Sequence, residues 1–435
     1  MNNSKIAILI VFLISIVTSA FAHNTPVPKL SEIKRQHPKD ILIQANNHYT
    51  HKAYNKAYYY YLALRQLKKR VNVENTYRLG KTALYAKEFK MAKKYLALIL
   101  DKGSKYSLVT FEYGKALKHL GDYSNAITYF KKYRTAHQGE RYNDYLGIAK
   151  RHIAACEKAL ESKEYSMDIE IESLGENFEE LGGSVRSLTV ESKYGTRLVE
   201  YQDDRGTCIK KVMADNSIEL LTSSAGNPIF NNKSPYIAPD GESVYFTREE
   251  LSTTGEVEYK IYTGNITKNG DVDKIRKLGS GVNRIGCSSL YPTLSTTEHG
   301  QEILYFASTQ PGGYGGYDIW YSVRMTNREF TKAYNLGVRV NSTDDEITPF
   351  YYQEDQELYF SSNKPDGFGG FDVYKMAGEK KLWDGKKATH LSDPVNSHGD
   401  DMHYTKDKKG NGSFSTNRTG GKDKTVKFKK KIPAA

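Results

Sequence analysis

The pattern of hydrophobic and polar positions changes near residue 165. Before that point, apolar residues recur at the three- and four-residue spacing of amphipathic helices. After it, short segments alternate between apolar and polar residues and are separated by Gly, Asp-Gly and Pro turns. The chain has 435 residues, more than one hydrophobic core usually serves. The pattern therefore predicts two domains, a helical one over residues 23–163 and an all-β one over residues 164–435.

The first 22 residues have the features of a secretory signal peptide. They contain Lys5, an apolar run over residues 6–17 and a small-residue end, Ala20-Phe21-Ala22, that fits an A-x-A cleavage site. A run of about a dozen apolar residues is short for a membrane span. No Cys follows the cleavage site, so nothing indicates a lipid anchor. We expect an exported protein whose mature chain begins near His23.

A repeat runs through the helical domain, where Ala45, Gly80 and Gly114 align at offsets of 35 and 34 residues. Three further sets of residues then align, namely Tyr54, Phe89 and Tyr123; Ala57, Ala92 and Ala126; and Tyr61, Leu96 and Phe130. A small residue, an aromatic, an Ala and a large apolar residue in this order are typical of TPR repeats. The sequence predicts a TPR α-solenoid of three repeats, capped by a further helix over residues 140–161.

TPR arrays usually bind partners along the concave face formed by the first helix of each repeat. The candidate partner-binding residues on that face are Asn46, Tyr49, Tyr77, Lys81, Tyr85, Phe111, Lys115, Lys118 and His119. Lysines among aromatic rings suit an acidic or C-terminal peptide, since the charge steers the peptide and the rings supply contact area. The alternative is ordinary exposed helix surface.

Two segments of the β domain, residues 304–321 and 358–374, nearly repeat at a distance of 54 residues. A second marker, a Leu followed by Val-Asn, recurs in phase at residues 278–283, 336–341 and 391–396. The clearest copy shows four strands, which we place at residues 347–352, 358–362, 371–376 and 388–391. Four strands in a unit of about 50 residues are typical of a β-propeller blade.

The glycine-rich link inside the repeat has a mechanical explanation. Glycines around an aromatic ring allow positive φ and close backbone packing, while Asp318 and Asp372 can accept hydrogen bonds from turn amides. A phosphate-binding loop is disfavoured because no helix N-terminus follows these glycines. The last unit ends after a third strand at residues 425–429, and the missing fourth strand is matched by residues 167–175. We expect five blades, or six if residues 203–230 contain another.

The net charge of +12 is unevenly distributed. Residues 23–163 carry 28 Lys and Arg against 11 Asp and Glu, whereas residues 164–435 carry 34 against 40. A basic helical domain favours an acidic peptide, an acidic glycan or an anionic membrane surface over nucleic acid in an exported protein, and a merely solvated surface is the alternative. The three cysteines, Cys156, Cys208 and Cys287, are expected to be free thiols, with a Cys208–Cys287 bridge as the alternative.

No catalytic motif is present in the sequence. It has no G-x-S-x-G elbow, H-E-x-x-H, C-x-x-C or dinucleotide fingerprint, so it indicates no catalytic residues, no metal site and no cofactor. The acidic pieces at residues 344–346 and 400–401 indicate turns that cap strands rather than a calcium site. We therefore expect a non-enzymatic binding scaffold. The alternative is a glycan-binding or hydrolytic protein that works at the central mouth of the propeller.

The string from Tyr359 to Tyr374, joined to a TPR array, resembles the TPR and WD40-like (PD40) envelope proteins of Bacteroidota, the PorE-like group associated with type IX secretion and gliding. The resemblance implies a periplasmic protein peripheral to the outer membrane, with secretion as the alternative. The chain ends at Ala435 without an OmpA-like domain and lacks a lipobox Cys. The resemblance thus implies a shortened adaptor that joins an outer-membrane β-barrel to other envelope components.

Overall fold

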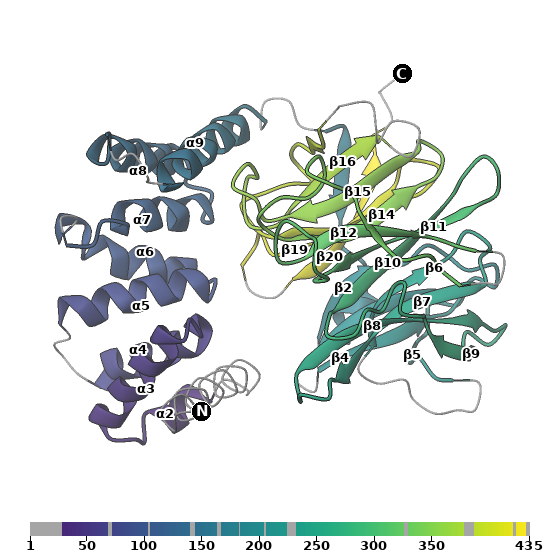
Figure 1. Cartoon of the computed structure of the whole chain (residues 1–435), viewed down its shortest axis with the longest axis horizontal. Coiled ribbons are helices and arrows are strands. Elements are labelled where there is room, and N and C mark those ends of the chain that lie inside the picture. Colours follow the sequence, from purple (N-terminus) through teal and green to yellow (C-terminus); the bar gives the residue numbers. More distant parts are fainter. Residues whose placement is uncertain are drawn as a thin grey trace, which may run out of the picture. The chain divides into compact units, whose positions relative to one another are not determined.

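The computed structural model has a helical unit that ends at Glu157 and a β unit that begins at Lys158 (Figure 1). The predicted signal peptide, residues 1–22, lies outside the residues that the structure describes. The described residues are 28–67, 72–102, 105–139, 144–162, 167–181, 183–203, 206–223, 232–325, 329–377, 387–420 and 423–431.

Helices in the first unit pack as consecutive pairs, α3 on α4, α5 on α6 and α7 on α8. Their bounds, with the flanking helices, are α2 (Leu30–Ile33), α3 (Pro38–Thr50), α4 (Tyr54–Leu67), α5 (Val73–Tyr85), α6 (Phe89–Ala97), the 3-10 turn η1 (Leu100–Lys102), α7 (Val109–Lys118), α8 (Tyr123–Ala136) and α9 (Asp144–Ser162). The expected helical region is therefore confirmed.

Small residues let the paired helices approach closely. A Cβ atom added at Gly80 in α5 would lie 2.9 Å from the side chain of Leu96 in α6. A Cβ atom added at Gly114 in α7 would lie 3.0 Å from the ring of Phe130 in α8. These are the positions at which the sequence repeat sets a small residue against a large apolar one, so the repeat has a direct packing reason.

The second unit is a β-propeller of five four-stranded antiparallel sheets. From the innermost strand outward, the blades are β2 (Ser184–Leu188), β3 (Arg197–Asp203), β4 (Gly206–Val212) and β5 (Ile218–Leu220); β6 (Asn232–Ile237), β7 (Ser243–Leu251), β8 (Val257–Ile266) and β9 (Val272–Lys277); β10 (Ser289–Thr296), β11 (Glu302–Ser308), β12 (Asp318–Val323) and β13 (Tyr334–Asn335); β14 (Glu346–Tyr352), β15 (Glu357–Ser362), β16 (Asp372–Ala377) and β17 (Thr389–His390); and β18 (Asp401–Lys406), β19 (Gly412–Thr416), β20 (Lys424–Lys430) and β1 (Ile169–Glu172). A short helix, α10 (Glu176–Glu179), lies between β1 and β2.

The first strand of the β unit completes the last blade. Strand β1 pairs antiparallel with β20, with Ile169 opposite Lys430 and Glu172 opposite Lys427. The strand nearest the start of the domain thus closes the ring of blades, because β18 and β19 supply the rest of the same sheet. The predictions of five blades and of this closure are confirmed.

The asparagine of the Val-Asn marker forms hydrogen bonds with the third strand of its blade, just beyond the last residue that pairs with the fourth strand. Asn341 accepts a hydrogen bond from the Ile319 amide (2.8 Å) and donates one to the Ile319 carbonyl (2.9 Å). Asn283 and Asn396 bond in the same way to Ile261 and Val373. All three asparagines are buried. The side-chain amide replaces a missing strand residue, which explains why the marker recurs in phase.

The glycine-rich links lie against the loop that enters the next blade. A Cβ atom at Gly315 would overlap the carbonyl oxygen of Asp344, and one at Gly369 would overlap that of Gly399. Neither glycine has a positive φ, so the close approach explains these residues and the expected left-handed conformation does not. The predicted carboxylate contacts are confirmed, because Asp318 accepts from the Tyr314 amide at 2.7 Å, and Asp372 likewise from the Gly369 amide.

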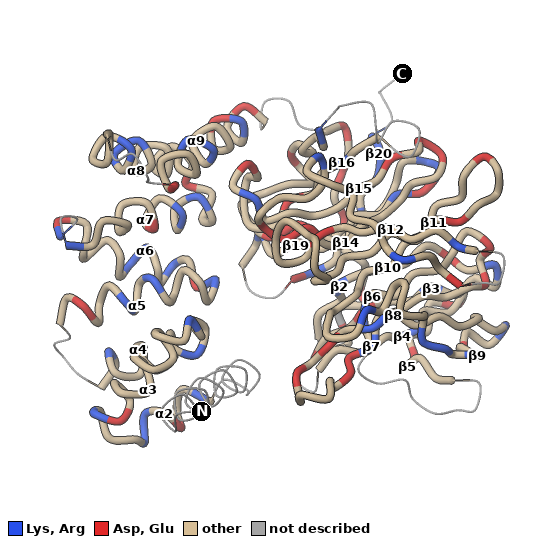
Figure 2. The backbone as a smooth tube through the Cα atoms, viewed as in Figure 1, with Lys and Arg blue, Asp and Glu red and all other residues tan. Residues whose placement is uncertain are grey.

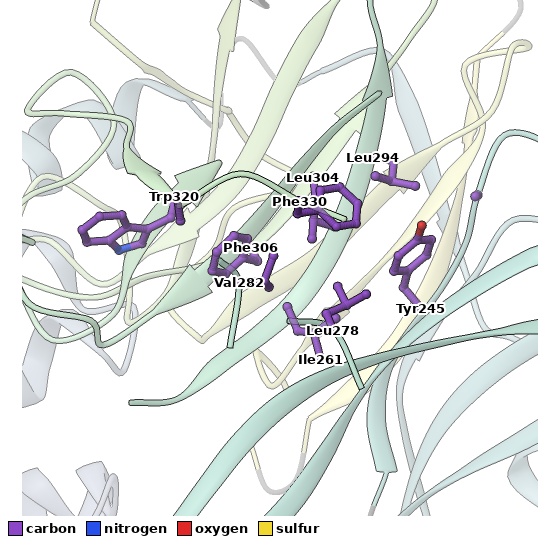
Figure 3. Close-up of a cluster of buried hydrophobic side chains, with 11 residues drawn as sticks. Tyr245, Ile261, Leu278, Val282, Leu294, Leu304, Phe306, Trp320 and Phe330 are labelled. Carbon is purple, nitrogen blue, oxygen red and sulfur yellow. The ribbon is translucent and has the colours of Figure 1, made fainter. Parts of the chain in front are cut away.

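Apolar side chains fill the space between neighbouring blades. Figure 3 shows the cluster between the second and third blades, which contains Tyr245, Ile261, Leu294, Phe306 and Trp320. Each of these side chains is at least nine-tenths buried. Burial of one such side chain stabilises a fold by roughly 1.5–3 kcal/mol, so the blades adhere through their facing sheets.

Substitution of Asn341 by Ala is expected to destabilise the propeller. It removes two buried hydrogen bonds and leaves the Ile319 amide and carbonyl without these partners, so the free energy of unfolding should fall by about 2 kcal/mol. Urea unfolding of the full chain, followed by tryptophan fluorescence, measures the change. The matched variant Asn269→Ala alters an exposed turn residue and should stay within about 0.5 kcal/mol of wild type. Equal stability of the two variants would contradict this role of the Asn341 hydrogen bonds.

Candidate functional site

Each innermost strand has a β-bulge at the same level of the ring. The pairing with the second strand shifts between Val185 and Ser187 in β2, Lys233 and Tyr236 in β6, Leu290 and Thr293 in β10, Ile347 and Phe350 in β14, and Met402 and Thr405 in β18. The first residues inside these bulges are Arg186, Ser234, Tyr291, Thr348 and His403. Bulges re-aim side chains and often lie beside functional sites.

Four of these five bulge residues adopt the left-handed backbone conformation. Their φ angles are 53° at Ser234, 58° at Tyr291, 50° at Thr348 and 54° at His403. A β-branched residue such as Thr348 is rare there, and such backbone strain costs of the order of 1–3 kcal/mol per residue. Repetition of the same strained conformation in four blades indicates that the side-chain direction it produces has a use.

The bulges line a hollow that we call the axial pocket. It has a cavity volume of about 70 Å³ and is lined from all five blades, by Ser187, Leu188, Thr189, Val190, Ser234, Pro235, Tyr236, Tyr291, Pro292, Thr348, Pro349, Phe350, His403, Tyr404 and Thr405. Among the lining residues that the structure describes there is no carboxylate, Lys or Arg, so the wall consists of rings, hydroxyl groups, two aliphatic side chains and one imidazole.

His403 is the titratable group of that wall. Its Nδ1 lies 2.9 Å from the hydroxyl of Ser415, and its Nε2 has no hydrogen-bond partner among the described residues. Burial, with a smaller effect of nearby Arg186, lowers the pKa of His403 to about 3. The imidazole is therefore neutral at physiological pH. Its amide is linked to the neighbouring bulge through the Thr348 hydroxyl at 3.4 Å.

A largely buried ion pair lies close to the bulge residues. Glu200 is 2% exposed and accepts a hydrogen bond from the Ser234 amide at 2.7 Å. The Arg186 guanidinium lies 3.9 Å from Glu200 and 3.2 Å from Asp423. Burial, reinforced by Glu200, raises the pKa of Tyr291, so its hydroxyl stays neutral. Among the described residues no group of three His, Cys, Asp or Glu side chains could hold a metal ion.

The sequence analysis missed the axial pocket, although a signal was present. Pro235, Pro292 and Pro349 follow the bulge residue in three of the five inner strands. Pro interrupts a strand interior and is tolerated at bulges, so three such residues in repeat phase mark the irregularity. The positions of Arg186 and His403 carry no such marker.

In the helical unit, several predicted partner-binding residues gather around Glu112, a buried carboxylate that the sequence analysis did not single out. Lys81 Nζ lies 3.2 Å from Glu112 Oε1, and Lys115 lies over the ring of Tyr85. Burial raises the pKa of Glu112, while Lys81 acts in the opposite direction. Of the residues around Glu112, Tyr85 is 48% exposed. Lys81 is therefore already engaged within the unit.

Three of the nine predicted partner-binding residues lie in the core of the helical unit, because their helix faces point between helices. Tyr77, Phe111 and Lys118 are 8%, 4% and 1% exposed. Their contacts are Tyr106 for Tyr77, Phe130 and Tyr133 for Phe111, and His152 for Lys118. This placement corrects the expectation that they form an exposed face.

The remaining predicted residues also have contacts inside the unit. Asn46 accepts hydrogen bonds from the Tyr61 hydroxyl (2.7 Å) and from Arg78 (2.9 Å). Tyr49 lies under the Arg78 guanidinium, and the ring of His119 stacks on Phe89 at 4.2 Å. These contacts position the side chains and leave the partner-binding role a prediction.

Comparisons with known proteins give a fold likeness for the β unit. Neither the protein-family models nor the curated proteins contain a match. Among solved structures, a thermostable family-43 glycoside hydrolase is 12% identical, with a TM-score of 0.37 and coverage of 57% of this chain and 89% of its own. The α-L-arabinofuranosidase of Lactobacillus brevis has the same identity and TM-score, with 57% and 90% covered. The Penicillium chrysogenum α-L-arabinanase has 12% identity, a TM-score of 0.34, and 55% and 80% covered.

These comparisons correct two expectations. The non-enzymatic scaffold and the absence of enzyme activity are contradicted, since the similar solved structures are glycoside hydrolases. The scaffold interpretation relied on missing linear motifs, and a propeller site assembled from five blades has none to find. A likeness at this level shows the fold alone, so the function has to be argued from the axial pocket itself.

Two further features bear on earlier expectations. No helix in the described ranges combines the length and apolar character needed to cross a membrane. Cys156, Cys208 and Cys287 are free thiols, with Cys208 partly exposed and the other two buried.

Substitution of Lys81 by Met is expected to destabilise the helical unit. It leaves the Glu112 carboxylate buried without its ion-pair partner, which costs about 3 kcal/mol in comparable buried pairs. The variant Lys93→Met breaks the more exposed pair with Asp122 and should cost less than about 1 kcal/mol. Far-UV circular dichroism during urea unfolding measures both. A change at Lys81 as small as that at Lys93 would contradict the buried pair.

The titration of His403 predicts a pH dependence of propeller stability. The pKa of a histidine in the unfolded chain is about 6.5, whereas the pKa of His403 in the folded protein is lowered to about 3. The stability that the neutral imidazole contributes is fully present above the unfolded pKa. It is lost as the pH falls from about 6.5 toward about 3, by up to about 1.4 kcal/mol per pH unit. His403→Phe should flatten the slope of stability against pH, measured by urea unfolding from pH 7 to 4. His299→Phe, at an exposed site, should leave it unchanged; equal slopes in wild type and His403→Phe would contradict the assignment.

Proposed function

We propose that the propeller binds a carbohydrate in the axial pocket. The observation that carries the proposal is the convergence of rings, hydroxyl groups and a neutral imidazole from five blades on one uncharged hollow. A sugar presents apolar C–H faces that pack on rings and hydroxyl groups that require several donors and acceptors. The wall offers both kinds of contact, with Tyr291 and Phe350 among the rings and Ser234 and Thr348 among the hydroxyl groups.

The positions of the carboxylates favour binding over hydrolysis as the primary function of the pocket. Glycoside hydrolysis usually employs two carboxyl groups on opposite sides of the scissile bond. The described lining residues supply none, and Glu200 accepts a hydrogen bond from the Ser234 backbone amide. Cleavage of the bound glycan is therefore a second readout, which tests whether residues outside the wall complete a catalytic pair.

We further propose that the helical unit is a TPR array and that the chain works in the cell envelope. The repeat contacts of Gly80 with Leu96 and of Gly114 with Phe130 support the TPR assignment. The signal-like residues 1–22 and the resemblance of residues 359–374 support export to the periplasm. Lys and Arg recur along this unit in Figure 2, which supports an acidic or anionic partner for it.

Substitution of Tyr291 by Ala is expected to weaken carbohydrate binding about tenfold, because it removes a ring from the wall of the pocket. Isothermal titration calorimetry of the full chain with arabinotriose, xylotriose, cellotriose and chitotriose measures the affinity. Tyr334→Ala, which alters an exposed tyrosine on strand β13 of the same blade, is the matched control and should bind like wild type.

The same titrations decide the proposal. Binding of at least one trisaccharide by wild type, with loss in Tyr291→Ala only, would support the axial site. Absence of binding by wild type to every member of the set, or equal weakening in both variants, would overturn it. Release of new reducing ends from the bound trisaccharide would identify the protein as a glycoside hydrolase.

A further inference from the structure

A second hollow, which we call the seam groove, lies where the first and last blades meet. It is lined by residues 188–191 and Arg197 of the first blade and by residues 405–407, 411–413 and 427–429 of the last. Its cavity volume of about 320 Å³ lies in the range of small-molecule sites. Leu188, Thr189, Val190 and Thr405 line both this groove and the axial pocket, so the two hollows adjoin.

One lysine of the groove lacks the carboxylate that its position in the sheet would supply. Lys427 of β20 lies directly opposite Glu172 of β1. The Glu172 carboxylate instead accepts a hydrogen bond from Lys429, at 2.8 Å. The ammonium group of Lys427 has only a long contact, 3.4 Å, with the carbonyl oxygen of Leu174, and no carboxylate of the described residues forms an ion pair with it. Lys427 is partly buried, so this charge is only partly solvated.

A second cation faces Lys427 from the other blade. Arg197 begins β3 and lines the groove with its side chain 40% exposed. Burial lowers the pKa of Lys427, the charge of Arg197 lowers it further, and Lys429 adds to this effect while Glu172 opposes it. Like charges held across a groove leave a positive potential that attracts anions.

The carboxylates that line the groove do not cancel this potential at Lys427. Glu191 holds the Arg197 guanidinium from one side, at 2.9 Å. Asp407 accepts hydrogen bonds from the backbone amides of Lys409 and Asn411, at 2.8 and 3.0 Å, and so stabilises its own turn. Among the described lining residues the remaining cation, Lys406, is paired with Asp355 outside the groove. Lys427 is therefore the position where an added anion gains most.

We infer that the seam groove is an anionic-sugar subsite of the propeller: Lys427 and Arg197 bind the carboxylate of an acidic sugar residue that extends from the axial pocket. This inference rests on the proposed carbohydrate site and names its substrate class, oligosaccharides that contain uronic acids. An ammonium group offers three donors and a guanidinium offers a planar fork, and both form strong hydrogen bonds with a carboxylate.

Continuity of the two hollows favours a carboxylate carried on a sugar over a free small anion. A free anion would gain only the contacts with Lys427 and Arg197, in a groove that is open to water and screening ions. A carboxylate tethered to a sugar in the axial pocket is held at a high effective concentration beside the same cations. The acidic sugar should therefore bind more tightly than either the neutral sugar or the free anion.

Matched pairs of oligosaccharides test the inference on the full chain. One pair is cellotriose and cellotriuronic acid, and the other is xylotriose and xylotriose with one glucuronic acid branch. Isothermal titration calorimetry should show that the acidic member of a pair binds about tenfold more tightly than its neutral partner. The advantage should shrink as the salt concentration rises from about 0.05 M to about 0.5 M, because the groove is partly exposed.

Variants locate the effect within the groove. Lys427→Met keeps much of the side-chain volume and removes the charge, so the ratio of acidic to neutral affinity should fall about tenfold. Arg197→Met should lower the ratio about threefold, since Glu191 already engages the guanidinium. The matched control is Lys424→Met, at an exposed lysine of the same strand that does not line the groove, and it should keep the wild-type ratio.

A spectroscopic readout separates ligand binding from a structural role of the lysine. The pKa of Lys427, followed through the ¹³Cε resonance of lysine-labelled protein and assigned by its loss in Lys427→Met, should lie below that of exposed lysines. It should rise when the acidic trisaccharide binds, because a carboxylate then offsets the charge of Arg197. The neutral trisaccharide should not raise it. An unchanged Lys427 pKa in the acidic complex would overturn the inference.

The outcomes distinguish the subsite from the carbohydrate site on which it depends. If wild type binds no member of either pair and none of the neutral trisaccharides, the proposed carbohydrate site fails. If wild type binds a neutral member and its acidic partner no more tightly, the carbohydrate site stands and the subsite fails. If free glucuronate or sulfate raises the pKa of Lys427 while the acidic trisaccharide gains no affinity, the groove takes a small anion only, which would also overturn the inference.

Discussion

Pairing of β1 with β20 closes the ring of blades, and the axial pocket depends on that closure. The innermost strands of five sheets share one axis only when the last sheet is completed by the first strand of the β unit. The bulges at Arg186 and His403, in the first and last blades, then lie at the same level of the ring as those of the other blades. A site of this kind has no contiguous sequence, because each blade contributes one or two residues to it.

The ring is held by polar contacts that hydrophobic packing alone would not specify. Asparagines such as Asn341 replace missing strand residues, and glycines such as Gly315 let one blade approach the loop that enters the next. With the blades fixed in this way, the inner strands can bear several left-handed residues, a strain that a looser sheet would relieve by slipping in register. Rigid support of a strained, converging wall is what a preorganised binding site requires.

Much of the fold could be predicted from the sequence, because repeat spacing reports which residues occupy equivalent positions. The Val-Asn marker and the Gly-aromatic link located the blades, and the incomplete last unit located the closing strand. Spacing does not report which face of a helix is covered, so the buried Phe111 and Lys118 were expected on a surface. The role of Glu112 was missed for the same reason. The axial pocket was missed because its Pro residues are typical of turns in a sequence, whereas here they occupy bulges.

The most direct test of the axial site is a crystal structure of the full chain with the neutral trisaccharide that binds most tightly. The sugar is expected in the axial pocket, with one face packed near the ring of Tyr291. A trisaccharide bound elsewhere on the chain, with the axial pocket unchanged from the unbound state, would contradict the proposed function.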